Sequence, residues 1–490
     1  MSKAAAAVLS SDEVDAIDAA TYRLLETVGV LVREPRALRL LLDAGATLAV
    51  KPDRVVIPAH LLKEALRRVP KQWTWFGRDR RHDLRVGEGG RTRLGPGSAC
   101  SNFLDYSTGK CRPPAAKDGI DLVRLMDALE LVDINFTPVD DEADGLPARF
   151  HQTDTLIRDL TYTTKPLVGP SYDGTMAKDG LEVVAVLAGG KEELRRRPML
   201  AGYCDPVSPL VHDRTMTETL VEYAALGQPV FIMALDLAGA SAPATLAGTL
   251  LLQNAEVLSG ILIAHLVNPD APVIYGSVSG IMDMRAGTAS VGGPEFALVS
   301  AASAQLAHHY GIPCSVGGQS DSKMHDAQAS MEKMMTLLSA VTAGADFVDL
   351  FFGSFEGFNT TSLEQVVIDH DIAGFVFRYR DGITVDEATL GLDLIREVGP
   401  GGNYLRNRSA LRHTRQWMLR EDYLPSVADR RSRFAWEKAG SSSLLERAHA
   451  RVTQLLSEHQ DPAIDPGALR EMKVILERIR KDCLSGESAT

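Results

Sequence analysis

The sequence predicts a (β/α)8 barrel, or TIM barrel, with an N-terminal extension of helices and a strand and with additional C-terminal helices. From about residue 92, short apolar or β-branched runs alternate with helical patterns, which indicates parallel strands joined by helices. About eight such units over about 290 residues match a barrel in count and in length. A doubly wound α/β sheet is the alternative, but no glycine-rich dinucleotide-binding turn follows a predicted strand. We therefore divide the chain into an N-terminal extension (1–90), a barrel catalytic domain (91–380) and a C-terminal helical extension (381–490).

The N-terminal extension is predicted to hold three helices and one strand. Amphipathic patterns cover residues 14–28, 36–42 and 61–69, and a glycine or a proline follows each of them. Trp73 and Trp75 then alternate with polar residues, as in a strand with one packed face. We expect these aromatic side chains to serve packing.

The barrel elements follow in order along the chain. The predicted strands are residues 92–98, 133–138, 165–170, 199–203, 230–235, 273–277, 314–317 and 347–352. The helices between them are predicted at residues 119–129, 150–160, 177–188, 215–225, 244–265, 294–309 and 327–343, and 362–377 is the eighth barrel helix.

The C-terminal extension reads as charged helices with apolar stripes. They are predicted at residues 385–398, 410–419, 442–459 and 467–481. Such helices wrap a barrel or contact another subunit, and we expect a homo-oligomer whose barrel mouths stay free.

Composition excludes several classes of function. The formal net charge is −12, and an acidic chain has no general affinity for nucleic acid. The most apolar stretch, 246–267, contains glutamine, asparagine, glutamate and histidine, so we expect a buried helix and no membrane span. Five widely spaced cysteines form no C-x-x-C pair and no zinc-like spacing, which suits reduced thiols in a cytoplasmic protein without a bound metal.

The barrel mouth is predicted to bind a cation. Catalytic groups of such barrels lie just past the carboxyl ends of the strands. The residues at these positions are rich in acids and in aromatic side chains, which together attract a quaternary ammonium group. A packing role for some of the aromatic rings is the alternative. The predicted substrate-binding residues are Tyr203, Asp205, Tyr275, Phe352, Phe355 and Glu356.

A second predicted feature is the segment that follows the seventh strand. Gly317 and Gly318 permit close approach of a bulky ligand to the backbone, while Asp321 and Ser322 resemble a helix cap, so a purely structural turn is the alternative. Lys323 lies in a polar loop, which argues against a Schiff-base lysine. The chain contains no familiar catalytic motif, so the catalytic residues stay unassigned.

The sequence resembles the MttB-like (trimethylamine methyltransferase) corrinoid methyltransferases. The similar segments span most of the chain, from about residue 20 to about residue 460. They include residues 24–30, 41–46, 55–58, 317–323 with Asp326, Gln328 and Glu332, 401–405, and His413 with Thr414.

The resemblance implies a barrel that moves a methyl group from a methylated amine to the cobalt of a separate corrinoid protein. The trimethylamine enzymes of this family carry pyrrolysine, whereas this chain consists of ordinary amino acids, and pyrrolysine-free relatives use quaternary amines such as glycine betaine. We expect a glycine betaine-like substrate and a cognate corrinoid partner that carries the cobalamin. Gly317, Gly318 and Gln319 are the predicted corrinoid-facing residues. A lyase or aldolase that uses Lys323 and a non-enzymatic betaine-binding protein are the alternatives.

Overall fold

The computed structural model describes residues 6–49, 54–141 and 147–485. Its centre is a parallel sheet of seven strands in the order β6-β18-β17-β14-β12-β10-β9. Each neighbouring pair in this sheet is parallel, as successive β/α units require. The strands are β6 (Arg93–Pro96), β9 (Leu167–Val168), β10 (Leu200–Cys204), β12 (Val230–Ala234), β14 (Val273–Ser277), β17 (Cys314–Gly317) and β18 (Phe347–Phe352).

The sheet closes into a barrel through residues 133–139, which lie between its two edges. The Asp133 amide donates to the Leu94 carbonyl at 2.9 Å, and the Asn135 amide donates to the Pro166 carbonyl at 3.1 Å. The predicted second strand is not regular, because the Asp133 carboxylate accepts the Leu94 amide at 2.9 Å in place of a backbone carbonyl and because Pro138 has no amide hydrogen to donate. The predicted (β/α)8 barrel is confirmed, with one irregular strand.

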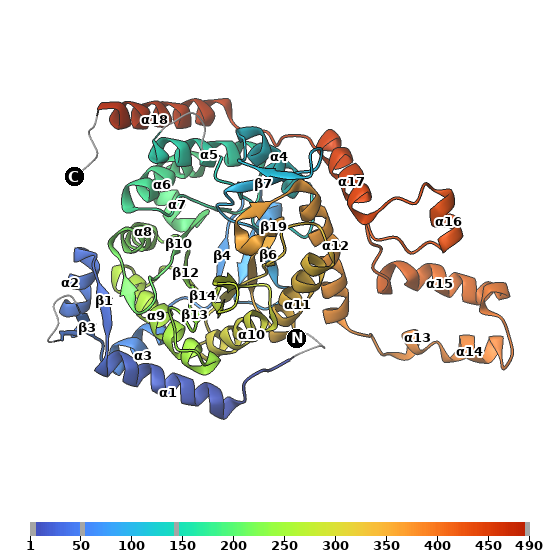
Figure 1. Ribbon diagram of the computed structural model, residues 1–490, viewed down its shortest axis with the longest axis horizontal. Helices are drawn as coiled ribbons and strands as arrows, with labels where there is room; N and C mark the ends of the chain where they lie inside the picture. The colour runs from blue at the N-terminus through green and yellow to red at the C-terminus, as the bar shows by residue number, and fades with distance from the viewer. Residues whose placement is uncertain (1–5, 50–53, 142–146, 486–490) are drawn as a thin grey trace.

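Eight helices ring the barrel (Figure 1). The helix α9 (Leu246–Val267), of 22 residues, is the one helix in the described part of the chain that is long and apolar enough to cross a membrane, and most of it is buried. This burial agrees with the expected core helix. The ring consists of α4 (Ala116–Asp127), α5 (Ala148–Tyr162), α6 (Gly174–Ala188), α8 (Arg214–Ala225), α9 (Leu246–Val267), α10 (Pro294–His309), α11 (Ala327–Ala343) and α12 (Leu363–Asp381).

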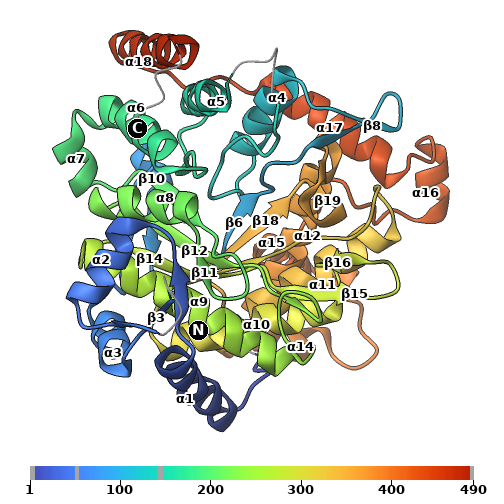
Figure 2. The ribbon, with the colours of Figure 1, turned by 60° about the vertical axis from the view of Figure 1, so that its left-hand side comes forward.

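The loops at the carboxyl ends of the strands pair with one another into small sheets that form a rim. Figure 2 shows several of these strands beside the ends of β6 and β18. One small sheet joins β7 (Asn102–Asp105) and β8 (Lys110–Arg112) to β19 (Ser354–Phe355) and β20 (Thr360–Thr361). The other consists of β13 (Leu237–Ala238), β15 (Gly280–Asp283) and β16 (Thr288–Ser290).

The N-terminal extension packs directly on the barrel. Helices α1 (Ser11–Thr27) and α3 (Ala59–Arg68) lie against α9, with α2 (Pro35–Asp43) beside them, and β1 (Val30–Val32) pairs with β11 (Val211–His212). β1 also pairs with β3 (Arg54–Val56), and β3 pairs on its other side with β2 (Thr47–Leu48).

The predicted strand with Trp73 and Trp75 is β4 (Trp73–Trp75), which pairs with β5 (Leu84–Val86). The Trp75 ring centroid lies 5.8 Å from that of Phe231 and 6.3 Å from that of Phe347, on barrel strands β12 and β18. Trp75 therefore fills the amino-terminal end of the barrel, in agreement with a packing role.

The C-terminal helices α17 (Leu444–Glu458) and α18 (Pro466–Ser485) wrap the barrel, against α4 and α12 and against α5 and α6 (Figures 1 and 2). The single helix predicted at 385–398 is wrong. It is split into α13 (Glu387–Leu390) and α14 (Leu392–Val398) at Gly391, whose φ of +59° ends a right-handed helix. Together with α15 (Arg408–Glu421) and α16 (Arg433–Lys438), they project from the body of the molecule (Figure 1).

Candidate functional site

A cavity of about 280 Å³ opens at the carboxyl ends of the strands, on the side of β6, β9 and β10. Its wall combines carboxyl groups, aromatic rings and small polar groups, from the barrel strands and from α5. Two of the predicted substrate-binding residues, Tyr203 and Asp205, lie in this wall. The others that bear on its chemistry are Phe136, Asp140, His151, Asp159 and Tyr172.

Tyr203 joins the cavity to the interior of the barrel. Its ring centroid lies 5.2 Å from that of Phe231, so the cavity rests on the aromatic core. Burial raises the pKa of the Tyr203 hydroxyl, and the neighbouring carboxyl of Asp349 raises it further, so the hydroxyl stays protonated. The Ser315 hydroxyl donates to Asp349 at 2.7 Å, and burial raises the pKa of Asp349 to about 6. Asp349 thus holds the Tyr203 ring by its hydroxyl end.

Two carboxyl groups of the wall have raised pKa values. Asp159 is buried, and desolvation raises its pKa to about 7 although Thr137 donates from its amide and from its hydroxyl, at 3.1 and 2.5 Å. Asp205 lies at the cavity and is exposed. Desolvation, followed by the nearby Asp213 carboxyl, raises its pKa above the usual range. A cation beside either carboxyl group lowers its pKa, because a positive charge stabilises the ionised form.

A buried ion-pair group supports the wall from behind. Burial raises the pKa of Asp141, but hydrogen bonds from His151 and Arg158 outweigh it and bring the value to about 2. The Arg158 guanidinium binds both Asp141 oxygens, at 2.7 and 3.0 Å, and His151 Nε2 lies 3.0 Å from Oδ1. This arrangement fixes the His151 ring at the cavity.

The structure does not bring Tyr275 to the cavity. Its side chain is fully buried, and its hydroxyl donates to Asn254 Oδ1 of α9 at 3.0 Å. Tyr275 therefore lies between the barrel wall and a helix, and a substrate contact stays a prediction for it. Alternation along a strand puts every second side chain on that outer face, and sequence position alone did not show which face Tyr275 takes.

Phe352, Phe355 and Glu356 also lie outside the cavity wall. Phe352 is fully buried, with its ring centroid 5.1 Å from that of Phe351. Phe355 packs with Leu104 and Ala329, and Glu356 accepts the Thr360 hydroxyl at 2.8 Å. A substrate contact stays a prediction for these three residues, while the rings that line this cavity beside Tyr203 are Phe136 and Tyr172.

The glycines predicted to face the corrinoid are buried, and packing accounts for both. A Cβ atom at Gly318 would lie 2.8 Å from side-chain atoms of Phe351 and Val348, and one at Gly317 would lie 2.2 Å from Gln319 Oε1. Within the described residues, the buried amide of Gln319 has no hydrogen-bond partner. A contact to a corrinoid stays a prediction for these three residues.

The rest of this segment forms a hydrogen-bonded loop at the rim. Glu332 accepts the Asp321 amide at 2.8 Å and the Ser320 hydroxyl at 2.7 Å. The predicted helix cap at Asp321 is wrong. Asp326 caps α11, and the Asp321 carboxylate instead binds the backbone amides of the turn before α10, at 3.0 and 3.1 Å. Lys323 is exposed and donates to the Asp321 carbonyl at 2.6 Å.

Fold and cavity together define the class. The chain is a (β/α)8-barrel protein with a small acid- and aromatic-lined cavity at the carboxyl ends of its strands. The family described as trimethylamine methyltransferase (MTTB) matches residues 2–483, so the chain belongs to this family of methyltransferases.

Individual relatives agree with this assignment. The chain is 36% identical over 460 residues to the glycine betaine methyltransferase of Desulfitobacterium hafniense (strain Y51), covering 94% of each chain. It is 35% identical over 485 residues to the trimethylamine methyltransferase MttB of Methanosarcina barkeri, covering 97% of this chain and 95% of that one. The crystal structure of the Methanosarcina barkeri monomethylamine methyltransferase (MtmB) shares the fold, with a TM-score of 0.55 at 11% identity, covering 93% of this chain and 90% of that chain.

Proposed function

We propose that this methyltransferase moves a methyl group from a small quaternary amine of the glycine betaine type to the Co(I) of a separate corrinoid protein. The observation that carries the proposal is the cavity at the barrel mouth, where Asp159, Asp205 and Tyr203 meet. Carboxylates and ring faces stabilise a cation whose charge is permanent. The substrate named for the relative at 36% identity carries such a group, the quaternary ammonium of glycine betaine.

The chemistry asks little of the protein beyond binding and orientation. In a quaternary ammonium the leaving group is a neutral tertiary amine, so no proton donor is needed when the methyl carbon is attacked. The residues around the cavity hold the cation, aim one methyl group outward and exclude water. Orientation of this kind supplies several kcal/mol, on the order of the barrier reductions known for fixed reactants.

The corrinoid is proposed to stay on the partner protein. A cavity of about 280 Å³ accommodates a small amine and is far too small for a corrinoid ring. The cobalt therefore has to approach from the open side of the cavity. Bound cobalt supplies the nucleophile, and the chain supplies the positioned methyl donor.

We further propose a cytoplasmic homo-oligomer, which the projecting segment of α13–α16 supports. This segment exposes large apolar side chains, among them Leu390 at 61%, Leu405 at 81% and Phe434 at 75%. All five cysteines are free, as suits a reducing compartment. Light scattering on the purified chain measures the assembly, and a monomer would contradict it.

The decisive test follows the cobalt spectrum. The purified chain, its corrinoid partner or free Co(I) cobalamin, and glycine betaine are mixed without oxygen, and loss of the Co(I) absorbance reports methyl transfer. A panel of other quaternary amines follows. If none of them methylates Co(I), the proposal is wrong, and binding without transfer would favour a betaine-binding protein. A lyase or aldolase would instead need Lys323, which is exposed and lies outside the cavity wall.

A matched pair of phenylalanine variants tests the location of the site. Phe136 lines the cavity, whereas Phe355 is buried in a separate cluster at the rim. We expect Phe136→Ala to raise the KM for the amine by about tenfold, corresponding to the loss of one cation–π contact. Phe355→Ala should leave KM unchanged. The reverse result would indicate that the substrate binds beside Phe355 and not in the cavity.

A further inference from the structure

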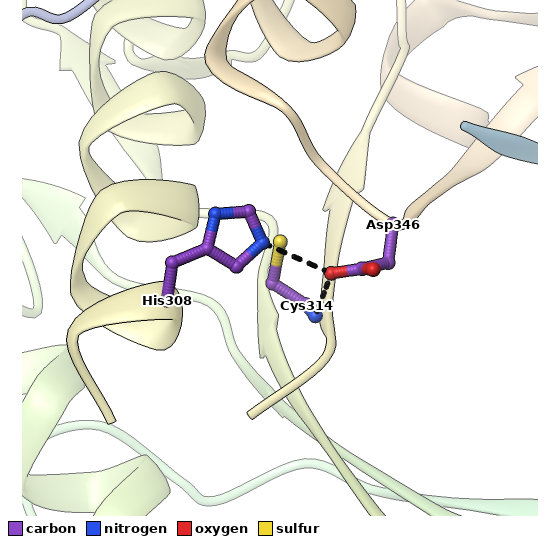
Figure 3. Close-up of side chains that lie close together, drawn as sticks. All are labelled: His308, Cys314 and Asp346. Carbon is purple, nitrogen blue, oxygen red and sulfur yellow. Dashed lines mark hydrogen bonds and ion pairs between the residues drawn. The ribbon is translucent and has the colours of Figure 1, made fainter. Parts of the chain in front are cut away.

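A cluster of potential metal ligands lies at the amino-terminal end of the barrel, opposite the cavity. Figure 3 shows its three side chains, His308, Cys314 and Asp346. His308 lies in the last turn of α10, Cys314 is the first residue of β17, and Asp346 immediately precedes β18. The ligand atoms of the three residues all lie within 4.8 Å of one another.

We propose that His308, Cys314 and Asp346 form a binding site for Zn²⁺. An imidazole nitrogen, a cysteine sulfur and a carboxylate oxygen are the donors that zinc takes in proteins, and a sulfur donor disfavours Mg²⁺ and Ca²⁺. Tetrahedral bonds of about 2.0–2.3 Å place ligand atoms roughly 3.3–3.8 Å apart. His308 Nε2 and Asp346 Oδ2 are 3.1 Å apart, so small side-chain shifts bring the set to this geometry.

The surroundings suit three protein ligands and one further position. Cys314 is fully buried, whereas the His308 side chain is 43% exposed, so an ion can enter from the surface. Asp346 also lines a cavity of about 640 Å³, which leaves room for a water ligand. On binding, the Cys314 thiol releases its proton to solvent and the sulfur bonds to the metal.

Hydrogen bonding gives the same residues a second way to interact. Asp346 Oδ2 accepts the Cys314 amide at 3.0 Å and lies beside His308, which ties α10, β17 and β18 together without any ion (Figure 3). A zinc site adds to this arrangement a stoichiometric metal and a stability that depends on it. Zinc stoichiometry and zinc-dependent stability therefore distinguish a metal site from a cluster that only forms hydrogen bonds.

The experiment uses the full chain after treatment with a chelator. Zinc is added, excess is removed, and bound metal is measured by mass spectrometry together with the melting temperature. We expect one zinc per chain and a rise in melting temperature, because a ligand that binds the folded state stabilises it. Less than half an equivalent of zinc in the unaltered chain would overturn the proposal.

Variants locate the ion. Cys314→Ser and Asp346→Asn should each lose the bound zinc and the zinc-dependent rise in melting temperature. His309→Ala is the matched control and should keep both, since His309 follows His308 in the chain but its ring nitrogens lie 3.9 Å from Asp15 and Asp18. Zinc retained in both ligand variants would mean surface binding elsewhere and would contradict the site.

Substitution with cobalt tests whether Cys314 is a metal ligand, because a cluster held by hydrogen bonds alone gives no metal absorption band. Co²⁺ in place of zinc produces a thiolate-to-metal absorption band in the near ultraviolet when cysteine is a ligand. The band should appear with the unaltered chain and with His309→Ala, and disappear with Cys314→Ser. Absence of the band in the unaltered chain would overturn the role of Cys314. Asp346→Asn keeps an oxygen for the Cys314 amide, so it guards against a variant that simply fails to fold.

Discussion

Binding of a quaternary amine should strengthen as the pH rises from 6 to 8. Asp159 lines the cavity with a pKa of about 7, raised by burial. Below that pH the carboxyl is neutral and offers a cation little attraction. Above that pH the carboxylate is ionised and attracts the cation. The affinity for the cation therefore increases with pH.

The size of the effect follows from the cavity. A volume of about 280 Å³ corresponds to a sphere of about 4 Å radius, so a cation at its centre lies about 5 Å from a carboxylate in the wall. At an effective dielectric constant of about 20, this attraction is about 3 kcal/mol and lowers the pKa of Asp159 by about two units. The ionised fraction of the free protein rises from about 0.09 at pH 6 to about 0.91 at pH 8, so the affinity should rise about tenfold.

Isothermal titration calorimetry at three pH values measures this dependence, and buffers of different ionisation enthalpy count the protons released. Asp159→Asn should reduce the pH dependence, and the Asp205 carboxyl of the same wall, whose pKa is also about 7, should account for the dependence that remains. Asp236→Asn is the matched control, because Asp236 has a similar pKa of about 7 but lies outside the cavity wall. The neutral analogue 3,3-dimethylbutanol should bind independently of pH. An affinity that stays flat or falls between pH 6 and pH 8 in the unaltered chain would refute this reasoning.

Three further variants test the roles that the structure assigns. Asp369→Asn should lower the free energy of unfolding, measured by urea denaturation, by about 3–5 kcal/mol, because it leaves the fully buried Lys333, 3.4 Å away, without its counter-charge. Adding Lys333→Met to this variant should restore part of the lost stability. Tyr275→Phe should lower stability by about 1–3 kcal/mol, because it leaves buried Asn254 without its donor, while KM for the amine stays unchanged; a raised KM would return this residue to the substrate site. Gly318→Val should lower the melting temperature through overpacking of about 1–3 kcal/mol, and loss of methyl transfer at an unchanged melting temperature would support corrinoid docking instead.

Much of the fold follows from local patterns along the chain. The predicted helices at 294–309 and 327–343 and the strands at 273–277, 314–317 and 347–352 have the bounds that the structure gives them. These elements are long helices or short, mainly apolar strands bounded by turn residues, so local patterns define them. The class of barrel and the likeness to the methyltransferase family were also available from the sequence.

The site depended on which face of each strand looks inward, and only the tertiary structure decided that. Tyr203 and Tyr275 both follow the strand-end rule, yet one lines the cavity and the other bonds to α9. The role of Asp349 was missed, because the strand pattern does not show that this buried acid contacts the Tyr203 hydroxyl. That contact exists only in the closed barrel. The metal-ligand cluster has the same origin, since Asp346 lies far along the chain from His308 and Cys314 and meets them only because β17 and β18 are neighbours in the sheet. Periodicity along one strand carries no information about which distant residues face it, and the closure of the barrel supplies it.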